Sequence, residues 1–126
     1  MTGAQVLVVE DNERNMKLFR DVLQASGYRI LEATTGERAV ELVIEHGPDL
    51  VLMDIQLPDI DGVNALDRLR ANERTASVPV LALTAQAMEG DRERFLAAGF
   101  DGYLSKPVNI ADLVATVERY CEGRCR

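Results

Sequence analysis

Polar side chains of three kinds directly follow four short apolar runs of the chain. The runs are 6–9, 50–53, 80–83 and 102–105. The residues that follow them are Glu10 with Asp11, Asp54, Thr84 and Lys106, in that order. Short aliphatic runs are typical of buried parallel strands, and parallel sheets bind ligands outside the carboxyl ends of their strands. The sequence therefore predicts three carboxylates, a hydroxyl and an ammonium at one sheet edge, a site for a divalent cation and a phosphoryl group.

The three carboxylates, on Glu10, Asp11 and Asp54, need a counter-charge. Two like unit charges about 4 Å apart repel each other by roughly 4 kcal/mol at an effective dielectric constant of about 20. Oxygen ligands favour a hard cation, and Mg²⁺ is commonly bound by one or two carboxylates together with water and phosphate oxygens. We therefore expect Mg²⁺ at this edge, with further positive charge from Lys106.

Asp54 is the candidate nucleophile, because a carboxylate can attack phosphorus to give an acyl phosphate. Thr84 offers a hydroxyl, the backbone N–H of Ala85 offers a second donor, and Lys106 offers a positive charge for a phosphoryl oxygen. Positioning and charge neutralisation of this kind promote phosphoryl transfer. Each residue alone has an ordinary explanation as a helix cap or a surface turn, but their joint placement favours a site.

The composition is typical of one folded domain. The 126 residues are enough for a single core, and 47% of them are hydrophobic. No run approaches the roughly 20 apolar residues of a membrane span, and no signal peptide is visible, so we expect a cytoplasmic protein that contacts no membrane. The formal net charge of −7 offers no basic surface for direct binding of nucleic acid. It favours a protein partner with a basic or apolar docking face.

Apolar runs alternate with helical patterns along the whole chain. Strands are predicted at 5–9, 29–33, 50–53, 80–83 and 103–105. Helices are predicted at 13–26, 36–46, 63–71, 88–97 and 110–121. Because helix-length crossovers impose parallel strands and right-handed connections, we expect an α/β fold of the (βα)5 type. This is a five-stranded, doubly wound parallel sheet with helices on both faces, formed by residues 1–126 as a single domain.

The first predicted helix has an apolar stripe that includes Leu18, Phe19 and Val22. We expect this stripe to face the core. Met16 lies off the stripe, where it would extend an exposed apolar patch that could dock a partner. A single exposed methionine is also ordinary on a protein surface, so the pattern leaves both interpretations open.

The chain resembles a known family, the receiver domains of bacterial two-component response regulators. The matching motifs, in order, are 9–12 (VEDN), 53–58 (MDIQLP), 61–62 (DG), 83–85 (LTA), Tyr103 and 106–107 (KP). They extend along essentially the whole chain. The segment 10–19 is most similar to single-domain cell-cycle regulators of the DivK type, and the receivers of hybrid histidine kinases share part of the pattern. The resemblance implies the flavodoxin-like receiver fold.

The resemblance also implies a role for each acidic residue of the site. Asp54 would accept a phosphoryl group from a phosphohistidine. Asp11, Asp54 and the backbone carbonyl of Gln56 would bind Mg²⁺, and Glu10 would act through a water molecule. Glu10 departs from the Asp that is commoner at its position, although Glu-Asp pairs also occur in the family.

A second set of residues would bind the phosphoryl group or respond to it, as the resemblance implies. Lys106 would contact a phosphoryl oxygen, and its peptide bond to Pro107 would be cis. Thr84 would move toward the phosphoryl group, and Tyr103 would rotate inward behind it. We therefore expect Thr84, the segment 85–90 and Tyr103 to form an element with two arrangements of similar energy.

The favoured function is a phosphorylation-dependent signalling switch that acts as a monomer. Its phosphoryl donor would be a histidine kinase or a histidine phosphotransfer protein, and its output would be contacts with a downstream protein target. Two alternatives stay open, a receiver from a hybrid histidine kinase and a phosphate-independent adaptor. A phosphatase of the haloacid dehalogenase type is disfavoured, because it needs a second Asp where Gln56 stands. We expect no enzyme activity beyond assistance of the chain's own phosphorylation and dephosphorylation.

Overall fold

A computed structural model describes residues 4–55, 57, 59, 62–85, 91–106 and 108–121. Five strands and five helices alternate along these residues. The strands are β1 (Gln5–Val9), β2 (Arg29–Ala33), β3 (Leu50–Asp54), β4 (Val80–Thr84) and β5 (Gly102–Ser105). The helices are α1 (Glu13–Ala25), α2 (Gly36–His46), α3 (Gly62–Ala71), α4 (Asp91–Ala98) and α5 (Ile110–Cys121).

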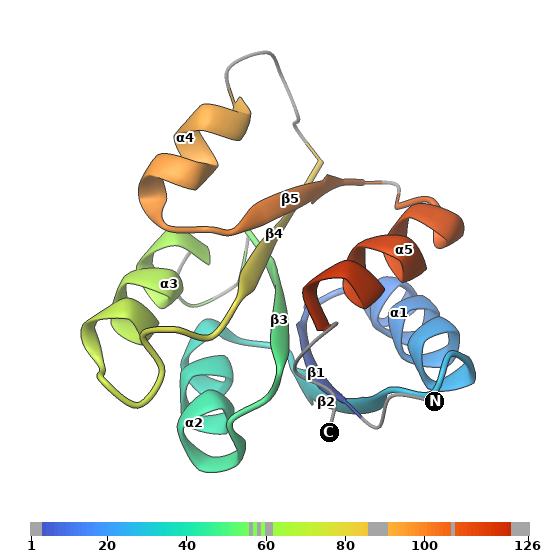
Figure 1. Cartoon of the computed structure of the whole chain (residues 1–126), viewed down its shortest axis with the longest axis horizontal. Helices are drawn as coiled ribbons and strands as arrows, with labels where there is room; N and C mark the ends of the chain where they lie inside the picture. The colour runs from blue at the N-terminus through green and yellow to red at the C-terminus, as the bar shows by residue number, and fades with distance from the viewer. Residues whose placement is uncertain are drawn as a thin grey trace.

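The strands form one parallel sheet in the order β2-β1-β3-β4-β5. Figure 1 shows α1 and α5 on one face of this sheet and α2, α3 and α4 on the other. The predicted doubly wound (βα)5 fold is therefore confirmed. In such a sheet the central strands are covered on both faces, which explains why they read as continuous apolar runs.

Alternate residues of the central strands enter two separate cores. The core beneath α2, α3 and α4 includes Leu7, Val9, Val51, Met53, Val80 and Ala82. The core beneath α1 and α5 includes Val6, Val8, Leu50, Leu52, Leu81 and Leu83. This division follows from the strand geometry, in which successive side chains point to opposite faces.

The predicted stripe of α1 was wrong at two positions. Leu18 is 37% exposed, whereas Met16 is only 6% exposed and packs in the core with Phe19 and Leu23. Residues at i, i+3 and i+7 share one helix face, so Met16, Phe19 and Leu23 face the sheet together. Leu18 is turned about 100° away from Phe19. Met16 therefore does not extend an exposed patch.

Two strands extend one residue beyond their predicted ends, so that Asp54 and Thr84 belong to β3 and β4. In the sheet, Asp54 pairs with Leu83, and Thr84 pairs with Ser105. Both polar residues are thus held by strand pairing. The start predicted for the fourth helix, 88–90, lies outside the described residues.

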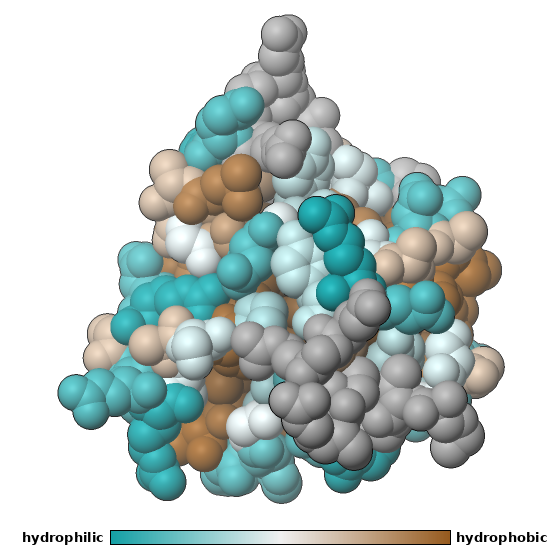
Figure 2. Space-filling model, in the orientation of Figure 1, coloured by the Kyte–Doolittle hydropathy of each residue, from teal (hydrophilic) through white to brown (hydrophobic). Residues whose placement is uncertain are grey.

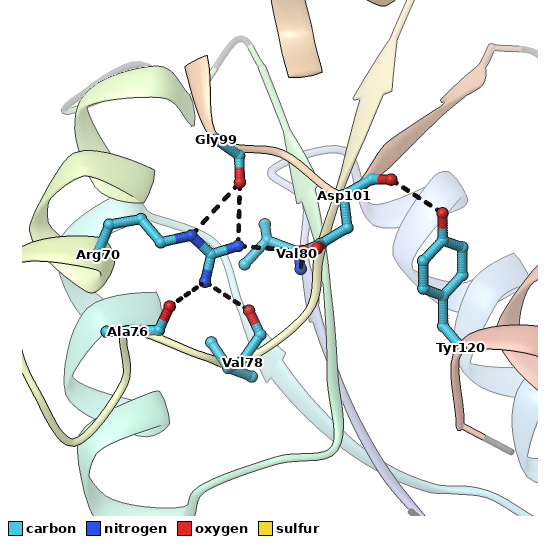
Figure 3. A network of polar contacts seen from close by, with 7 residues as sticks. All are labelled: Arg70, Ala76, Val78, Val80, Gly99, Asp101 and Tyr120. Atoms are coloured by element: carbon cyan, nitrogen blue, oxygen red, sulfur yellow. Dashed lines mark hydrogen bonds and ion pairs between the residues drawn. The ribbon is translucent and has the colours of Figure 1, made fainter. Parts of the chain in front are cut away.

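Arg70, near the end of α3, ties together the chain segments that precede β4 and β5 (Figure 3). Its guanidinium donates to the carbonyl oxygens of Val78, at 2.6 Å, and Gly99, at 3.0 Å. It also pairs with the carboxylate of Asp101 at 3.0 Å, which in turn accepts the backbone N–H of Val80 at 2.8 Å. This clamp fixes the starts of β4 and β5, at the sheet end opposite Thr84.

On the face drawn in Figure 2, hydrophilic and weakly polar residues separate several smaller apolar areas. Among the described residues, the large apolar side chains that are exposed are Leu18, Leu96 and Ile110. Within the same part of the chain, every helix is too short or too polar to cross a membrane.

Candidate functional site

A cleft of about 490 Å³ lies at the carboxyl ends of the central strands. Five residues predicted from the sequence line it: Glu10, Asp11, Asp54, Thr84 and Lys106. The other lining residues are Ile55, Leu57, Ala85, Arg94 and Phe95. The structure therefore brings together the carboxylates, the hydroxyl and the ammonium that the strand ends predict.

The three carboxylates converge because their strands are neighbours. Val9 pairs with Met53. The next residues, Glu10 just after β1 and Asp54 at the end of β3, therefore lie side by side. One oxygen each from Glu10, Asp11 and Asp54 lies within 4.8 Å of the others. Glu10 is 1% exposed and Asp54 is 6% exposed, whereas Asp11 is exposed to solvent. An all-oxygen set of this kind fits a hard divalent cation that enters from the solvent side.

Lys106 bridges two of these carboxylates. Its Nζ lies 2.6 Å from Glu10 Oε1 and 2.7 Å from Asp54 Oδ2. Its backbone N–H donates to the carbonyl oxygen of Thr84 at 2.7 Å, which anchors the end of β5 to the end of β4. Burial disfavours the ammonium, but the hydrogen bonds to Asp54 and Glu10 outweigh it, and the pKa of Lys106 is raised. Lys106 is therefore a positively charged side chain that the two carboxylates hold in place.

Glu10 is the most buried acid of the site. Burial is the main cause that raises the pKa of its carboxyl, and the neighbouring Asp54 carboxyl raises it further, whereas Lys106 opposes both. A proton at Glu10 and a metal ion would therefore compete for the same group of oxygens.

Two asparagines at the start of α1 support Glu10 and were not predicted as site residues. The Asn15 side-chain amide donates to Glu10 Oε1 at 3.3 Å, and the Asn12 backbone N–H donates to Glu10 Oε2 at 3.4 Å. The Asn12 side chain also caps α1 by accepting from the backbone N–H groups of Arg14 and Asn15. The preference for Asn at helix N-caps was the available signal.

Gly62 is a further supporting residue whose role depends on tertiary structure. A Cβ added there would lie 2.7 Å from the carbonyl oxygen of Asp54 and 2.9 Å from the Cα of Ile55. Its backbone N–H donates to the carbonyl oxygen of Ile55 at 2.8 Å. Only glycine therefore allows α3 to begin this close to the end of β3.

The remaining predicted residues have different positions. Tyr103 is half-buried and lines a second cavity of about 200 Å³, with its ring centroid 5.9 Å from that of Phe95. Phe95 itself lines the cleft. Gln56, Pro107 and the segment 86–90 lie outside the described residues.

Comparison with known proteins identifies the family. The sequence pattern of the response regulator receiver domain matches residues 6–118. The chain belongs to the response regulator receiver domain family. The polar-differentiation response regulator DivK of Brucella ovis is 46% identical to this receiver domain over 115 residues, which are 91% of this chain and 94% of that protein. The predicted resemblance to DivK-type regulators is confirmed.

Solved receiver structures agree with this assignment. The receiver domain of the sensor histidine kinase PA1611 from Pseudomonas aeruginosa superposes with a TM-score of 0.86 at 40% identity, over 94% of this chain and 97% of that one. That structure is described with a magnesium ion coordinated in its active-site cleft. The chemotaxis response regulator CheY4 of Vibrio cholerae superposes with a TM-score of 0.88 at 27% identity, over 94% of this chain and 99% of that one.

This receiver domain is a phosphorylation-dependent signalling switch of two-component systems, as predicted. Receiver domains interact with histidine kinases or phosphotransfer proteins and with downstream targets, and they are not enzymes in the usual sense. The comparisons do not favour the two alternatives, a hybrid-kinase receiver and a phosphate-independent adaptor. The acidic cluster of the cleft is compatible with a metal site.

Proposed function

We propose that Asp54 is the phosphoacceptor and that residues 1–126 act as one receiver domain switched by its phosphorylation. The observation that supports this most is the pairing of Asp54 with Lys106 at 2.7 Å, inside a cleft that holds two further carboxylates. Asp54 is largely buried and lines the cleft, so a phosphoryl group would approach it from there.

Mg²⁺ is the cofactor in this proposal. Glu10, Asp11 and Asp54 would hold it, with the backbone carbonyl of Gln56, a residue outside the described part of the chain. The support is the all-oxygen donor set and the magnesium ion in the cleft of the PA1611 receiver. When bound, Mg²⁺ supplies charge neutralisation for the carboxylates and for phosphoryl oxygens.

The proposed transfer uses the chain's own residues in defined roles. A carboxylate oxygen of Asp54 attacks the phosphorus of a phosphohistidine, the P–N bond breaks, and the imidazole nitrogen leaves with the electron pair. Lys106 holds a phosphoryl oxygen by its charge, and the Thr84 hydroxyl donates to another. The domain thus assists its own phosphorylation and dephosphorylation without acting on external substrates.

The proposed response begins with the added charge, about −1.5 to −2 at pH 7. Thr84 lines the cleft where this charge arises, and Phe95 connects the cleft to the ring of Tyr103. A shift of Thr84 toward the phosphoryl group would therefore change the packing that holds Tyr103. The donor would be a histidine kinase or a histidine phosphotransfer protein, and the receiver of the signal a downstream protein.

Three further features belong to the same proposal. The domain would act as a monomer, in the cytoplasm, and without direct contact to nucleic acid or membrane. The support for the last of these is the formal net charge of −7, which disfavours binding to phosphate backbones and anionic lipids. These features stay predictions.

Intact-mass spectrometry after incubation with acetyl phosphate tests the proposal. The variants are Asp54→Asn and, as a matched control on the exposed side of α3, Asp67→Asn. We expect the wild type and Asp67→Asn to gain one phosphoryl group with Mg²⁺ and none in EDTA, and Asp54→Asn to gain none. An equal gain in Asp54→Asn would contradict the assignment.

A further inference from the structure

The start of α2 is capped by a carboxylate from a distant part of the chain, that of Asp59. Its Oδ1 accepts the backbone N–H of Gly36 at 2.8 Å, and its Oδ2 accepts that of Glu37 at 3.0 Å. Asp59 follows these two residues by 23 and 22 positions. It belongs to the segment 55–61, which leads from β3 to α3. The two hydrogen bonds therefore tie this connecting segment to α2.

The hydrogen bonds of Asp59 complement the helix's own N-cap. The first N–H groups of a helix have no partner within the helix. The Thr35 side chain accepts the N–H of Arg38 at 3.1 Å, and those of Gly36 and Glu37 are accepted by Asp59. A carboxylate is well suited to this place, because it also meets the positive end of the helix dipole.

The helix is the better-anchored side of this contact. Ala39 and Val43 of α2 are buried in the core beneath α2, α3 and α4. Before the helix, the carbonyl oxygen of Ala33 at the end of β2 accepts the backbone N–H of Glu10 at 3.0 Å. The core and the sheet therefore hold the start of α2 in place, and Asp59 holds its own segment against it.

The segment 55–61 contributes to the wall of the cleft. Ile55 and Leu57 are among the residues that line it. The N–H of Gly62 donates to the carbonyl oxygen of Ile55 at 2.8 Å, which joins the two ends of the segment. Asp59 adds an attachment between these ends, two residues beyond Leu57. The shape of this wall therefore depends on a contact that lies outside the cleft.

The same segment carries one proposed ligand of the metal ion. The proposed function assigns the backbone carbonyl of Gln56 to Mg²⁺, and in the chain this residue stands between the two lining residues Ile55 and Leu57. Mg²⁺ demands a nearly octahedral arrangement of ligands at about 2.0–2.1 Å. A backbone carbonyl meets this demand only where its segment is held in place.

We propose that Asp59 is a positioning residue for Mg²⁺ binding. It anchors the segment 55–61 to α2 and so keeps the cleft wall in the arrangement that the cation needs. This inference rests on the proposed metal site. Asp59 acts through the backbone and supplies no ligand to the cation, because its carboxylate oxygens accept from Gly36 and Glu37.

Isothermal titration calorimetry with MgCl2 measures the affinity. We expect Asp59→Ala to weaken Mg²⁺ binding about tenfold, the lower end of the effect of residues that hold metal ligands in place. Asp59→Asn should retain most of the affinity, because its amide oxygen can still accept from the helix start. An equal loss in Asp59→Asn and Asp59→Ala would assign the effect to charge and overturn the inference.

Thr35→Ala is the matched control, because it removes another hydrogen-bond acceptor at the start of the same helix. In EDTA it should lower the melting temperature, as Asp59→Ala does, since each variant removes a cap of α2. Its affinity for Mg²⁺ should equal that of the wild type. A loss of affinity as large as that of Asp59→Ala would assign the effect to the stability of α2 and overturn the inference.

A second readout follows from the reciprocity of coupled equilibria. Because the Asp59 contact favours Mg²⁺ binding in this proposal, Mg²⁺ must favour the contact by the same factor. Amide hydrogen exchange, followed by NMR, should therefore slow at Gly36 and Glu37 when MgCl2 is added to the wild type, by up to about tenfold. The same addition should leave the exchange at these amides unchanged in Asp59→Ala.

Failure of this inference is distinguishable from failure of the proposed metal site. Unchanged Mg²⁺ affinity in Asp59→Ala would overturn the role of Asp59 alone. The metal site is tested by Asp11→Asn, which alters one of the three clustered carboxylates. Equal Mg²⁺ affinity in Asp11→Asn and the wild type would overturn the proposed metal site itself.

Discussion

At the scale of single residues, the site depends on how its negative charge is balanced. The ammonium of Lys106 serves two carboxylates at once, those of Glu10 and Asp54. Asp11 adds a third carboxylate within 4.8 Å. Without a divalent cation, Lys106 therefore offsets only part of the negative charge. Removal of the Lys106 ammonium should lower the stability of the whole domain.

Replacement of Lys106 by Met removes this ammonium and keeps an unbranched apolar stem. We expect the free energy of unfolding in EDTA to fall by about 1–3 kcal/mol, the contribution of hydrogen bonds between charged groups. Denaturant titration measures this, and excess Mg²⁺ should recover part of the loss. The control is Lys17→Met, which removes a solvent-exposed ion pair with Asp21 and should leave the free energy of unfolding almost unchanged. Equal losses in the two variants would contradict the bridging role of Lys106.

The raised pKa of Glu10 gives a pH dependence with a defined sign. The folded, metal-free domain binds this proton more tightly than the unfolded chain, where the glutamate pKa is 4.5. The resulting stabilisation is fully present below pH 4.5 and is lost as the pH rises through the raised pKa. The test compares the free energies of unfolding of the wild type and Glu10→Gln in EDTA as a function of pH. The wild-type value minus the variant value should decrease as the pH rises through this window. An increase would show that the pKa of Glu10 is lowered instead.

At the scale of elements, the start of α3 and the ends of the strands must meet at close range. Gly62 places the helix start directly against the backbone of Asp54 and Ile55. At the other end of the sheet, Arg70 holds the segments before β4 and β5. The contact of Gly62 borders the site directly, whereas the contacts of Arg70 affect the site only through the strands.

Substitution of Gly62 by Ala should disturb both stability and function. The added methyl would meet backbone atoms at 2.7 and 2.9 Å, so β3 or α3 must shift. We expect a loss of about 1–3 kcal/mol and slower phosphorylation of Asp54. Gly47→Ala is the control, because its φ of 57° is costly for Ala by about 1 kcal/mol although no heavy atom lies within 4 Å. Identical phosphorylation rates in the two variants would refute this role of Gly62.

Substitution of Arg70 by Met should affect stability alone. The carbonyl groups of Val78 and Gly99 and the carboxylate of Asp101 would lose a charged donor. We expect a loss of about 2 kcal/mol, measured by thermal unfolding, with unchanged Mg²⁺ affinity. The neighbouring exposed Arg68, whose pair with Glu37 spans 3.8 Å, provides the control variant Arg68→Met. A smaller effect for Arg70 than for Arg68 would exclude the clamp.

At the scale of the whole molecule, the sequence allows the fold to be predicted because every central strand is apolar on both faces. The same runs lead into the polar side chains, so the parallel topology alone brings Glu10, Asp54 and Thr84 to one edge. Leu18 was misplaced because adjacent apolar residues on α1 suggested a stripe one position away from the true one.

Several of the contacts that were not predicted join residues far apart in the chain. Arg70 bonds to Gly99 across 29 positions, and Arg94 reaches the cleft from a helix whose own pattern carries no metal or phosphate motif. No local propensity reports such contacts, because they exist only once the sheet and its helices are packed. The chemistry of strand ends can thus be predicted from sequence, whereas the supporting residues that come from distant segments cannot.

The most direct test of the central claim is to locate the phosphoryl group on the chain. The domain is phosphorylated with acetyl phosphate and Mg²⁺, and the acyl phosphate is reduced with borohydride, which converts a phosphorylated aspartate to homoserine. Peptide mass spectrometry then identifies the position. We predict homoserine at position 54 and at no other aspartate. Homoserine at another position, with Asp54 unchanged, would contradict the account.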